Sequence, residues 1–254
     1  TPGGVMTIAE AIAAAANTAV IIENATVIGV YGRGALIEDT TGKILAYAGS
    51  AVDVVVGDIV KVEGTMTTYG GLAQIGGTVT FTKTGSKAYT YPTAKVMDGA
   101  AFDAYLGNPV IEYVEYTGTL TINGYYYNVE IEGASTAIGS LAYVIDGTVD
   151  PALNGQKIDV RGWTIGTSSG KYVNTMIRSV VAAGTTPEPD PTPDPEPDPE
   201  PDPTPDTPAA GSKLTVEEFL TLANTENEYE LTGKITRVVN TTYGNFSLTD
   251  ETDT

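Results

Sequence analysis

The 254-residue sequence contains neither cysteine nor histidine. Without cysteine there can be no disulfide, thiolate nucleophile, zinc–thiolate site or iron–sulfur cluster. Without histidine the chain lacks the most common general base and metal ligand, and every serine–histidine arrangement is excluded. We therefore expect a protein that is not an enzyme and has no catalytic residue, cofactor or metal centre.

Long apolar runs and phenylalanine are also scarce. No run of 18 apolar residues exists, so we expect no membrane-spanning helix. Four phenylalanines stand against 15 tyrosines and 29 glycines, a balance that is typical of β-rich proteins with many turns.

Basic residues are outnumbered by acidic ones, and the net charge is −19. Residues 1–184 carry −6, residues 185–213 carry −7 and residues 214–254 carry −6, so the acidity is not confined to one segment. Acidic surfaces repel phosphate backbones, which disfavours nucleic acid as a partner. A glycan or a protein is the better candidate ligand.

A proline at every second position marks the segment from Pro187 to Pro205. Aspartate, glutamate and threonine fill the positions between, so the segment has nothing to bury, and the prolines and like charges favour extended backbone. We interpret residues 185–213 as an acidic, extended linker between folded regions.

Two short segments on either side of this linker share one helical pattern. Residues 7–18 and 215–225 both open with Thr-x-x-Glu, the capping box that satisfies free amides at a helix start. Apolar residues then follow at i, i+3, i+4 and i+7, which predicts an amphipathic helix. Residues 98–106 resemble a weaker third copy.

Strand patterns follow each predicted helix. Residues 57–64 and 155–162 both have glycine at each end and apolar residues at the same alternate positions, which predicts half-buried strands. Each full unit reads as a helix, three strands, an irregular connection and two strands.

These units resemble oligonucleotide/oligosaccharide-binding (OB) folds, which are small five-stranded barrels. The glycine-bounded strand Gly57–Gly64 makes them similar to the tandem OB-like modules of exported Bacteroidota surface lipoproteins, although Gln156 replaces the aspartate of that strand in the second unit. We therefore expect an all-β fold with short helices, built of tandem five-stranded OB-like barrels, each preceded by a short amphipathic helix. An immunoglobulin-like sandwich is the structural alternative.

The repeat predicts four regions. They are an OB-like domain at 1–91, a second at 92–184, the linker at 185–213 and a truncated third repeat at 214–254. The third copy ends near its second strand, so we expect the chain to be a fragment of a longer protein.

Strand alternation selects the candidate ligand-binding residues. The inner face of the segment 125–132 is expected to carry Tyr125, Tyr127, Val129 and Ile131. The outward positions of the second domain give the candidates Tyr126, Arg161, Trp163, Tyr172 and Asn174. Aromatic rings there could stack on sugars or bases, and amides could bind hydroxyls. For the single tryptophan, packing against a helix or another domain is the competing interpretation.

The first domain offers fewer candidates. Tyr31 and Arg33 lie beside Gly32 and Gly34, and Tyr69 precedes a glycine pair. Tyrosine–glycine turns are common in β proteins, so we interpret these residues as structural.

Three functions stay open at this level. The leading hypothesis is a noncatalytic, exported cell-envelope protein whose OB-like modules act as binding units or as spacers. The resemblance implies the cell surface or periplasm of a Gram-negative bacterium, with a lipid anchor outside residues 1–254 as one option. The alternatives are a single-stranded nucleic-acid-binding protein, and accessory modules of a secreted nuclease or hydrolase encoded beyond residue 254.

Overall fold

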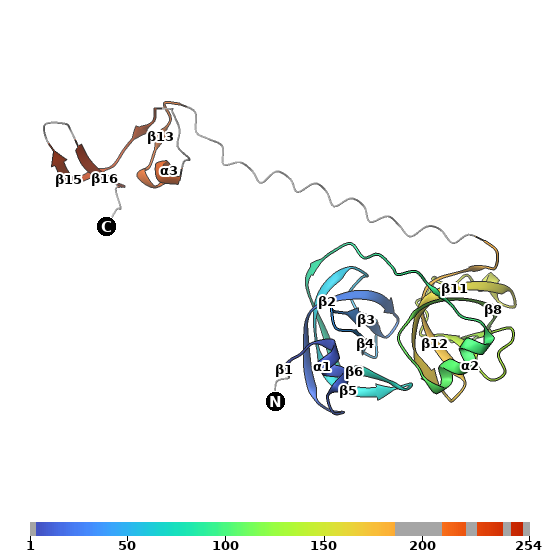
Figure 1. Ribbon diagram of the computed structural model, residues 1–254. Helices are drawn as coiled ribbons and strands as arrows, with labels where there is room; N and C mark the ends of the chain where they lie inside the picture. The colour runs from blue at the N-terminus through green and yellow to red at the C-terminus, as the bar shows by residue number, and fades with distance from the viewer. Residues whose placement is uncertain (1–3, 186–209, 222–227, 241–244, 251–254) are drawn as a thin grey trace. The chain divides into compact units, whose positions relative to one another are not determined.

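The computed structural model describes residues 4–185, 210–221, 228–240 and 245–250. The chain divides into two compact units, Thr1–Pro193 and Asp194–Thr254. The first unit contains two β-barrels side by side (Figure 1). The described chain is mostly strand with short helices, as expected. None of its described helices has the length and apolar character needed to cross a membrane.

Barrel 1 occupies the N-terminal part of the first unit. Its elements are β1 (Gly4–Val5), α1 (Ile8–Ala13), β2 (Ala19–Tyr31), β3 (Gly34–Glu38), β4 (Lys43–Tyr47), β5 (Asp58–Tyr69) and β6 (Leu72–Ser86). The strand order is β2-β3-β4-β6-β5, and β5 pairs again with β2. The strands β4 and β6 are parallel, whereas the other pairs of this ring are antiparallel.

Barrel 2 has the same strand order. Its elements are β7 (Lys95–Val96), α2 (Gly99–Gly107), β8 (Tyr113–Asn123), β9 (Tyr126–Glu130), β10 (Ile138–Leu141), the short 3-10 helix η1 (Pro151–Leu153), β11 (Lys157–Ser168) and β12 (Tyr172–Ala182). The ring β8-β9-β10-β12-β11 closes because β11 also pairs with β8. A closed five-stranded barrel is not a two-sheet sandwich, so the immunoglobulin-like alternative is wrong for this region.

The first predicted capping box is confirmed at α1. The amide of Glu10 donates to Thr7 Oγ1 at 3.3 Å, and the amide of Thr7 donates to Glu10 Oε2 at 2.8 Å. The helix ends at Ala13, earlier than the predicted 7–18. A third residue, Asp39, accepts a hydrogen bond from the amide of Ile8 at 2.8 Å and so ties the helix to the β3–β4 turn.

The second unit contains the other predicted capping box. Its elements are β13 (Lys213–Leu214), α3 (Val216–Thr221), β14 (Glu230–Leu231), β15 (Lys234–Asn240) and β16 (Asn245–Thr249). The amide of Glu218 donates to Thr215 Oγ1 at 3.1 Å, and Asp250 accepts from the amide of Val216 at 2.6 Å. Asp250 thus contacts its helix as Asp39 does in barrel 1. The Pro187–Pro205 segment lies outside the described residues.

Strand β3 is buried on both of its faces, which explains how the two barrels join. Ala35 and Ile37 point into the core of barrel 1, whereas Leu36 between them packs against barrel 2. We call the second set of contacts the interbarrel cluster. Its buried members are Ile28, Tyr31, Leu36 and Leu45 from barrel 1 with Tyr113, Trp163, Ile165 and Met176 from barrel 2. The outer surfaces of the two barrels therefore form a third hydrophobic core, in addition to the core inside each barrel.

Candidate functional site

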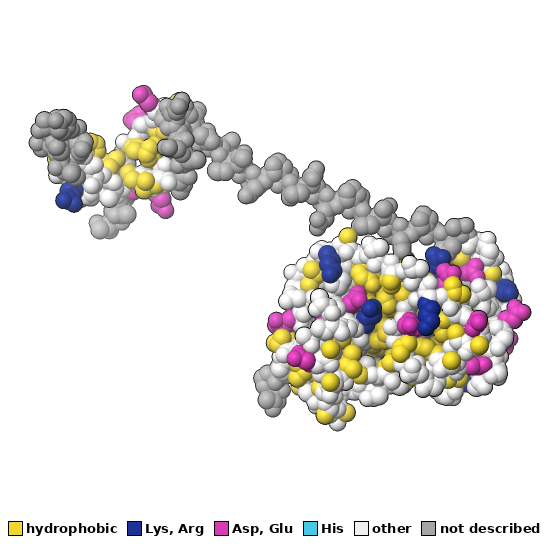
Figure 2. Space-filling view, viewed as in Figure 1, with side chains coloured by type: hydrophobic (Ala, Val, Ile, Leu, Met, Phe, Trp, Pro, Cys, Tyr) yellow, Lys and Arg dark blue, Asp and Glu magenta, His cyan; other side chains and the backbone are white. Residues whose placement is uncertain are grey.

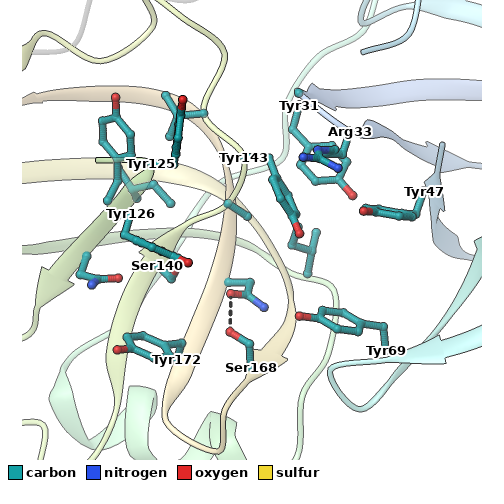
Figure 3. Close-up of a pocket in the computed structure, with 18 of the residues that line it drawn as sticks. Tyr31, Arg33, Tyr47, Tyr69, Tyr125, Tyr126, Ser140, Tyr143, Ser168 and Tyr172 are labelled. Atoms are coloured by element: carbon teal, nitrogen blue, oxygen red, sulfur yellow. Dashed lines mark hydrogen bonds between the residues drawn. The ribbon is translucent and has the colours of Figure 1, made fainter. Parts of the chain in front are cut away.

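A groove of about 950 Å³ is lined by residues of both barrels. That volume lies in the range of small-molecule sites, which is roughly 300–1,000 Å³. Tyrosine is the commonest lining residue, at positions 31, 47, 69, 125, 126, 127, 143 and 172. Figure 3 shows three of these rings reaching from barrel 1 toward the barrel 2 residues opposite.

The barrel 2 side of the groove follows strands β9, β10 and β12 and two adjoining turns. Tyr126 and Asn128 come from β9, and Ser140 comes from β10. The β8–β9 turn adds the most exposed ring, Tyr125, and the β11–β12 turn adds Ser169. Residues along a strand point alternately to its two faces, so Tyr126 and Asn128 of β9 lie on the same face of the sheet.

Polar groups of the groove are amides and hydroxyls. Ser168 donates a hydrogen bond from Oγ to Asn174 Oδ1 at 3.1 Å, which orients the amide (Figure 3). Gln74, Asn123 and Asn128 add further amides along the lining. Such groups can both donate to and accept from a ligand hydroxyl.

The centre of the groove is occupied by Tyr143, in the loop after β10. Its ring centroid lies 5.8 Å from that of Tyr31 and 6.4 Å from that of Tyr47. Its carbonyl accepts a hydrogen bond from the amide of Gly32 at 2.9 Å, so the loop is attached to barrel 1. The residue has a φ of 43°, a left-handed conformation that is uncommon for a tyrosine.

Burial raises the pKa of the Tyr31 phenol far above its usual range, and partial desolvation raises the pKa of the half-exposed Tyr143 phenol in the same direction. Neutral phenols can donate as well as accept hydrogen bonds, so this part of the wall keeps its donors at neutral and mildly basic pH.

Three of the five residues selected from the sequence line this groove. Tyr126 is 71% exposed, Tyr172 is half-buried and Asn174 is buried. Arg161 lies elsewhere: its Nε donates to Glu115 Oε2 of the neighbouring strand β8 at 2.7 Å. It is exposed but is not among the groove residues.

The structure decides between the two interpretations of Trp163: an exposed, stacking side chain is wrong, and packing against another domain is confirmed. Alternation placed this side chain correctly on the outside of barrel 2, but barrel 1 covers it and leaves it 2% exposed. Its Nε1 donates to the carbonyl of Ile28 at 3.1 Å. Trp163 therefore joins the barrels and cannot stack on a ligand.

Tyr125 was also misplaced. It was expected on the inner face with Tyr127, yet it is 97% exposed. Strand β9 begins only at Tyr126, and the turn before it contains Gly124 with a φ of 59°, so strand alternation does not reach Tyr125.

Several groove residues were assigned no function from the sequence. Tyr31 and Tyr69, interpreted there as structural, line the barrel 1 side, where Arg33 lies with them. Tyr47 and Tyr143 were not singled out at all. The excess of tyrosine over phenylalanine was the available signal, but it did not say which rings meet.

Searches among known proteins add no identification: no protein-family model matches this chain, and no curated protein matches it significantly.

Proposed function

We propose that the chain is a noncatalytic, exported cell-envelope binding protein built of OB-like modules, and that its tyrosine-lined groove binds a glycan. The observation that carries the proposal is the position of the groove on barrel 2. OB folds bind oligosaccharides and oligonucleotides on the face of their second and third strands and on the turns that join strands one to two and four to five. In barrel 2 these are β9, β10 and the β8–β9 and β11–β12 turns, which line the groove.

The chemistry of the lining supports a sugar ligand. Flat rings can stack on the apolar face of a sugar ring, while amides and hydroxyls bind its hydroxyl groups. Export and cell-envelope location are proposed on the resemblance of the Gly57–Gly64 strand, and binding is proposed on the groove.

Titration calorimetry of the full chain with glycans identified on a glycan array tests this function. The double substitution Tyr126→Ala and Tyr172→Ala removes two rings from the groove. Stacking contributes about 1–3 kcal/mol per ring, so the loss of two rings should lower affinity by at least roughly thirtyfold. Val96→Ala, at an exposed position of β7 away from the groove, is the control and should bind normally.

Binding that survives the double substitution unchanged would place the ligand elsewhere. An array on which no glycan binds the chain would refute the glycan proposal.

Single-stranded nucleic acid is the second candidate, because tyrosine rings stack on bases as well as on sugars. The charge pattern weighs against it. Figure 2 shows basic and acidic side chains interspersed on the visible face of the two-barrel unit, with no continuous basic stripe there. Titration with a labelled oligonucleotide at low salt, where electrostatic attraction is strongest, decides between the two, and tight salt-sensitive binding would favour nucleic acid.

A further inference from the structure

We infer that the ligand of this groove is an uncharged glycan chain long enough to contact both barrels at once. The inference rests on the proposed glycan function and makes it more specific in two respects, the charge of the ligand and its length.

The charge argument concerns Arg33, which is the one basic residue lining the groove among the described residues. Its Nη1 donates to the carbonyl of Gly49 at 3.0 Å, and its guanidinium carbon lies 5.0 Å from the centroid of the Tyr143 ring. The cation is therefore engaged in building the wall of the groove.

The other charged lining residue is acidic. Asp146 lies in the loop that follows Tyr143 and adds negative charge to the lining. The one basic and the one acidic residue balance each other, so the lining has no net charge that would attract a carboxylate, sulfate or phosphate. A ligand that carries no charge of its own fits such a lining best.

The length argument concerns the way the two sides of the groove are fixed. The amide of Thr167 in barrel 2 donates to the carbonyl of Gly70 in barrel 1 at 2.9 Å. A Cβ built on Gly70 would lie 2.6 Å from the carbonyl oxygen of Thr167, so the two backbones approach as closely as glycine allows. With the Gly32–Tyr143 hydrogen bond, this contact holds both walls in place before a ligand arrives.

Exposed rings stand on both walls. Tyr69 of barrel 1 is 53% exposed and Tyr126 of barrel 2 is 71% exposed, while Tyr143 lies in the barrel 2 loop after β10 that is hydrogen-bonded to barrel 1. We expect a short sugar to contact one of these two exposed rings at a time. A longer chain can contact both walls without the cost of bringing two domains together, which is the advantage of a preorganised site.

Calorimetry of the full chain with linear oligosaccharides tests both parts. The probes are gluco-, xylo- and manno-oligosaccharides from disaccharide to octasaccharide, together with oligogalacturonides as free acids and as methyl esters. The methyl esters differ from the free acids in charge, so they form a matched pair. For a bound series, we expect affinity to rise at least about tenfold from disaccharide to octasaccharide, and any bound galacturonide to prefer the ester by a similar factor.

Single-ring variants locate the two walls. Tyr69→Ala and Tyr126→Ala each remove an exposed ring and should fold normally. Each should weaken binding of the longest bound oligosaccharide by roughly 5- to 150-fold, because one stacking contact contributes about 1–3 kcal/mol. Binding of the disaccharide should respond to one of the two variants at most, and Val96→Ala should change neither.

The outcomes separate this inference from the proposed function. If Tyr126→Ala weakens binding and Tyr69→Ala does not, the site is confined to barrel 2, so the inference fails and the proposed function stands. If the free acids bind as well as or better than the esters, the uncharged ligand is wrong. If affinity does not increase with length, the two-wall site is wrong. If no probe binds, charged or neutral, or if neither variant matters, the inference and the glycan groove fail together.

Discussion

Trp163 of barrel 2 donates a hydrogen bond from its indole nitrogen to the carbonyl of Ile28 in barrel 1, across 3.1 Å. Ile28 lies where the pairing of β2 with β3 shifts register between Val27 and Gly29. The indole therefore supplies a partner for a carbonyl at an irregularity of the barrel 1 ladder. One side chain thus satisfies a buried backbone group and fills the interbarrel cluster.

Trp163→Phe should destabilise the two-barrel unit. Phenylalanine keeps a ring in the cluster but removes the donor, which leaves the buried Ile28 carbonyl without it and costs about 1–3 kcal/mol in the free energy of unfolding. Chemical denaturation followed by circular dichroism measures this cost. Since Trp163 is the only tryptophan, the unaltered protein should also emit at a short wavelength. A red-shifted emission, or an unchanged stability of the variant, would contradict the buried hydrogen bond.

Gly29→Ala should disturb the same cluster from the other barrel. The added Cβ would lie 2.6 Å from Met176 Sδ and 3.3 Å from Trp163 Cδ1, so both side chains would have to move. Overpacking of this kind costs about 1–3 kcal/mol. Gly107→Ala is the matched control because its Cβ would meet no heavy atom within 4 Å beyond its chain neighbours and its own helix backbone, and alanine forms helix more readily than glycine. Thermal unfolding should separate the two variants in opposite directions.

Tyr116→Phe tests the polar contact inside barrel 2. The Tyr116 hydroxyl donates to Thr175 Oγ1 at 3.1 Å, and both residues are almost fully buried. Losing the donor should lower the free energy of unfolding by about 1 kcal/mol. A double-mutant cycle with Thr175→Val should give a coupling energy of roughly 0.5–1.5 kcal/mol. Strict additivity would show that the two hydroxyls do not interact.

Asp103→Asn should reduce stability in a pH-dependent way. The carboxylate of Asp103, on α2, accepts hydrogen bonds from the amides of Ser135, Ala137 and Thr136 and from the Ser135 hydroxyl. These bonds hold the pKa of Asp103 well below its usual range. Because the folded-state pKa is lowered, the stabilisation is complete above the unfolded-state pKa of about 3.9 and is lost as the pH falls through the folded-state pKa.

Melting temperatures measured from neutral to acidic pH provide the test of Asp103. The difference in melting temperature between the unaltered protein and the variant should be constant from about pH 6 to pH 8 and should become smaller below roughly pH 4. Asp53→Asn, at an exposed position, controls for the loss of one negative charge. A difference in melting temperature that does not change with pH would mean that asparagine at position 103 destabilises the protein for steric reasons instead.

Local patterns predicted much of the secondary structure. The Thr-x-x-Glu pairs at Thr7 and Thr215 form the capping boxes expected of them, because both partners lie within one helical turn. The alternation in the 57–64 segment indicated a half-buried strand, and β5 covers most of it. The contacts of Asp39 and Asp250 with their helix starts could not be predicted in this way, because a hydrogen bond between residues more than 30 positions apart depends on the turn that places the carboxylate.

The sequence by itself determined the acidity, the absence of cysteine and histidine, the short capped helices and the alternation that puts Trp163 outside its own barrel. Only the tertiary structure decided what lies against that outer face. The indole is buried because barrel 1 packs on it, and the same packing brings Tyr31, Tyr47 and Tyr143 together. Alternation is a property of one strand, whereas burial between barrels and the meeting of distant rings depend on contacts that no single segment specifies.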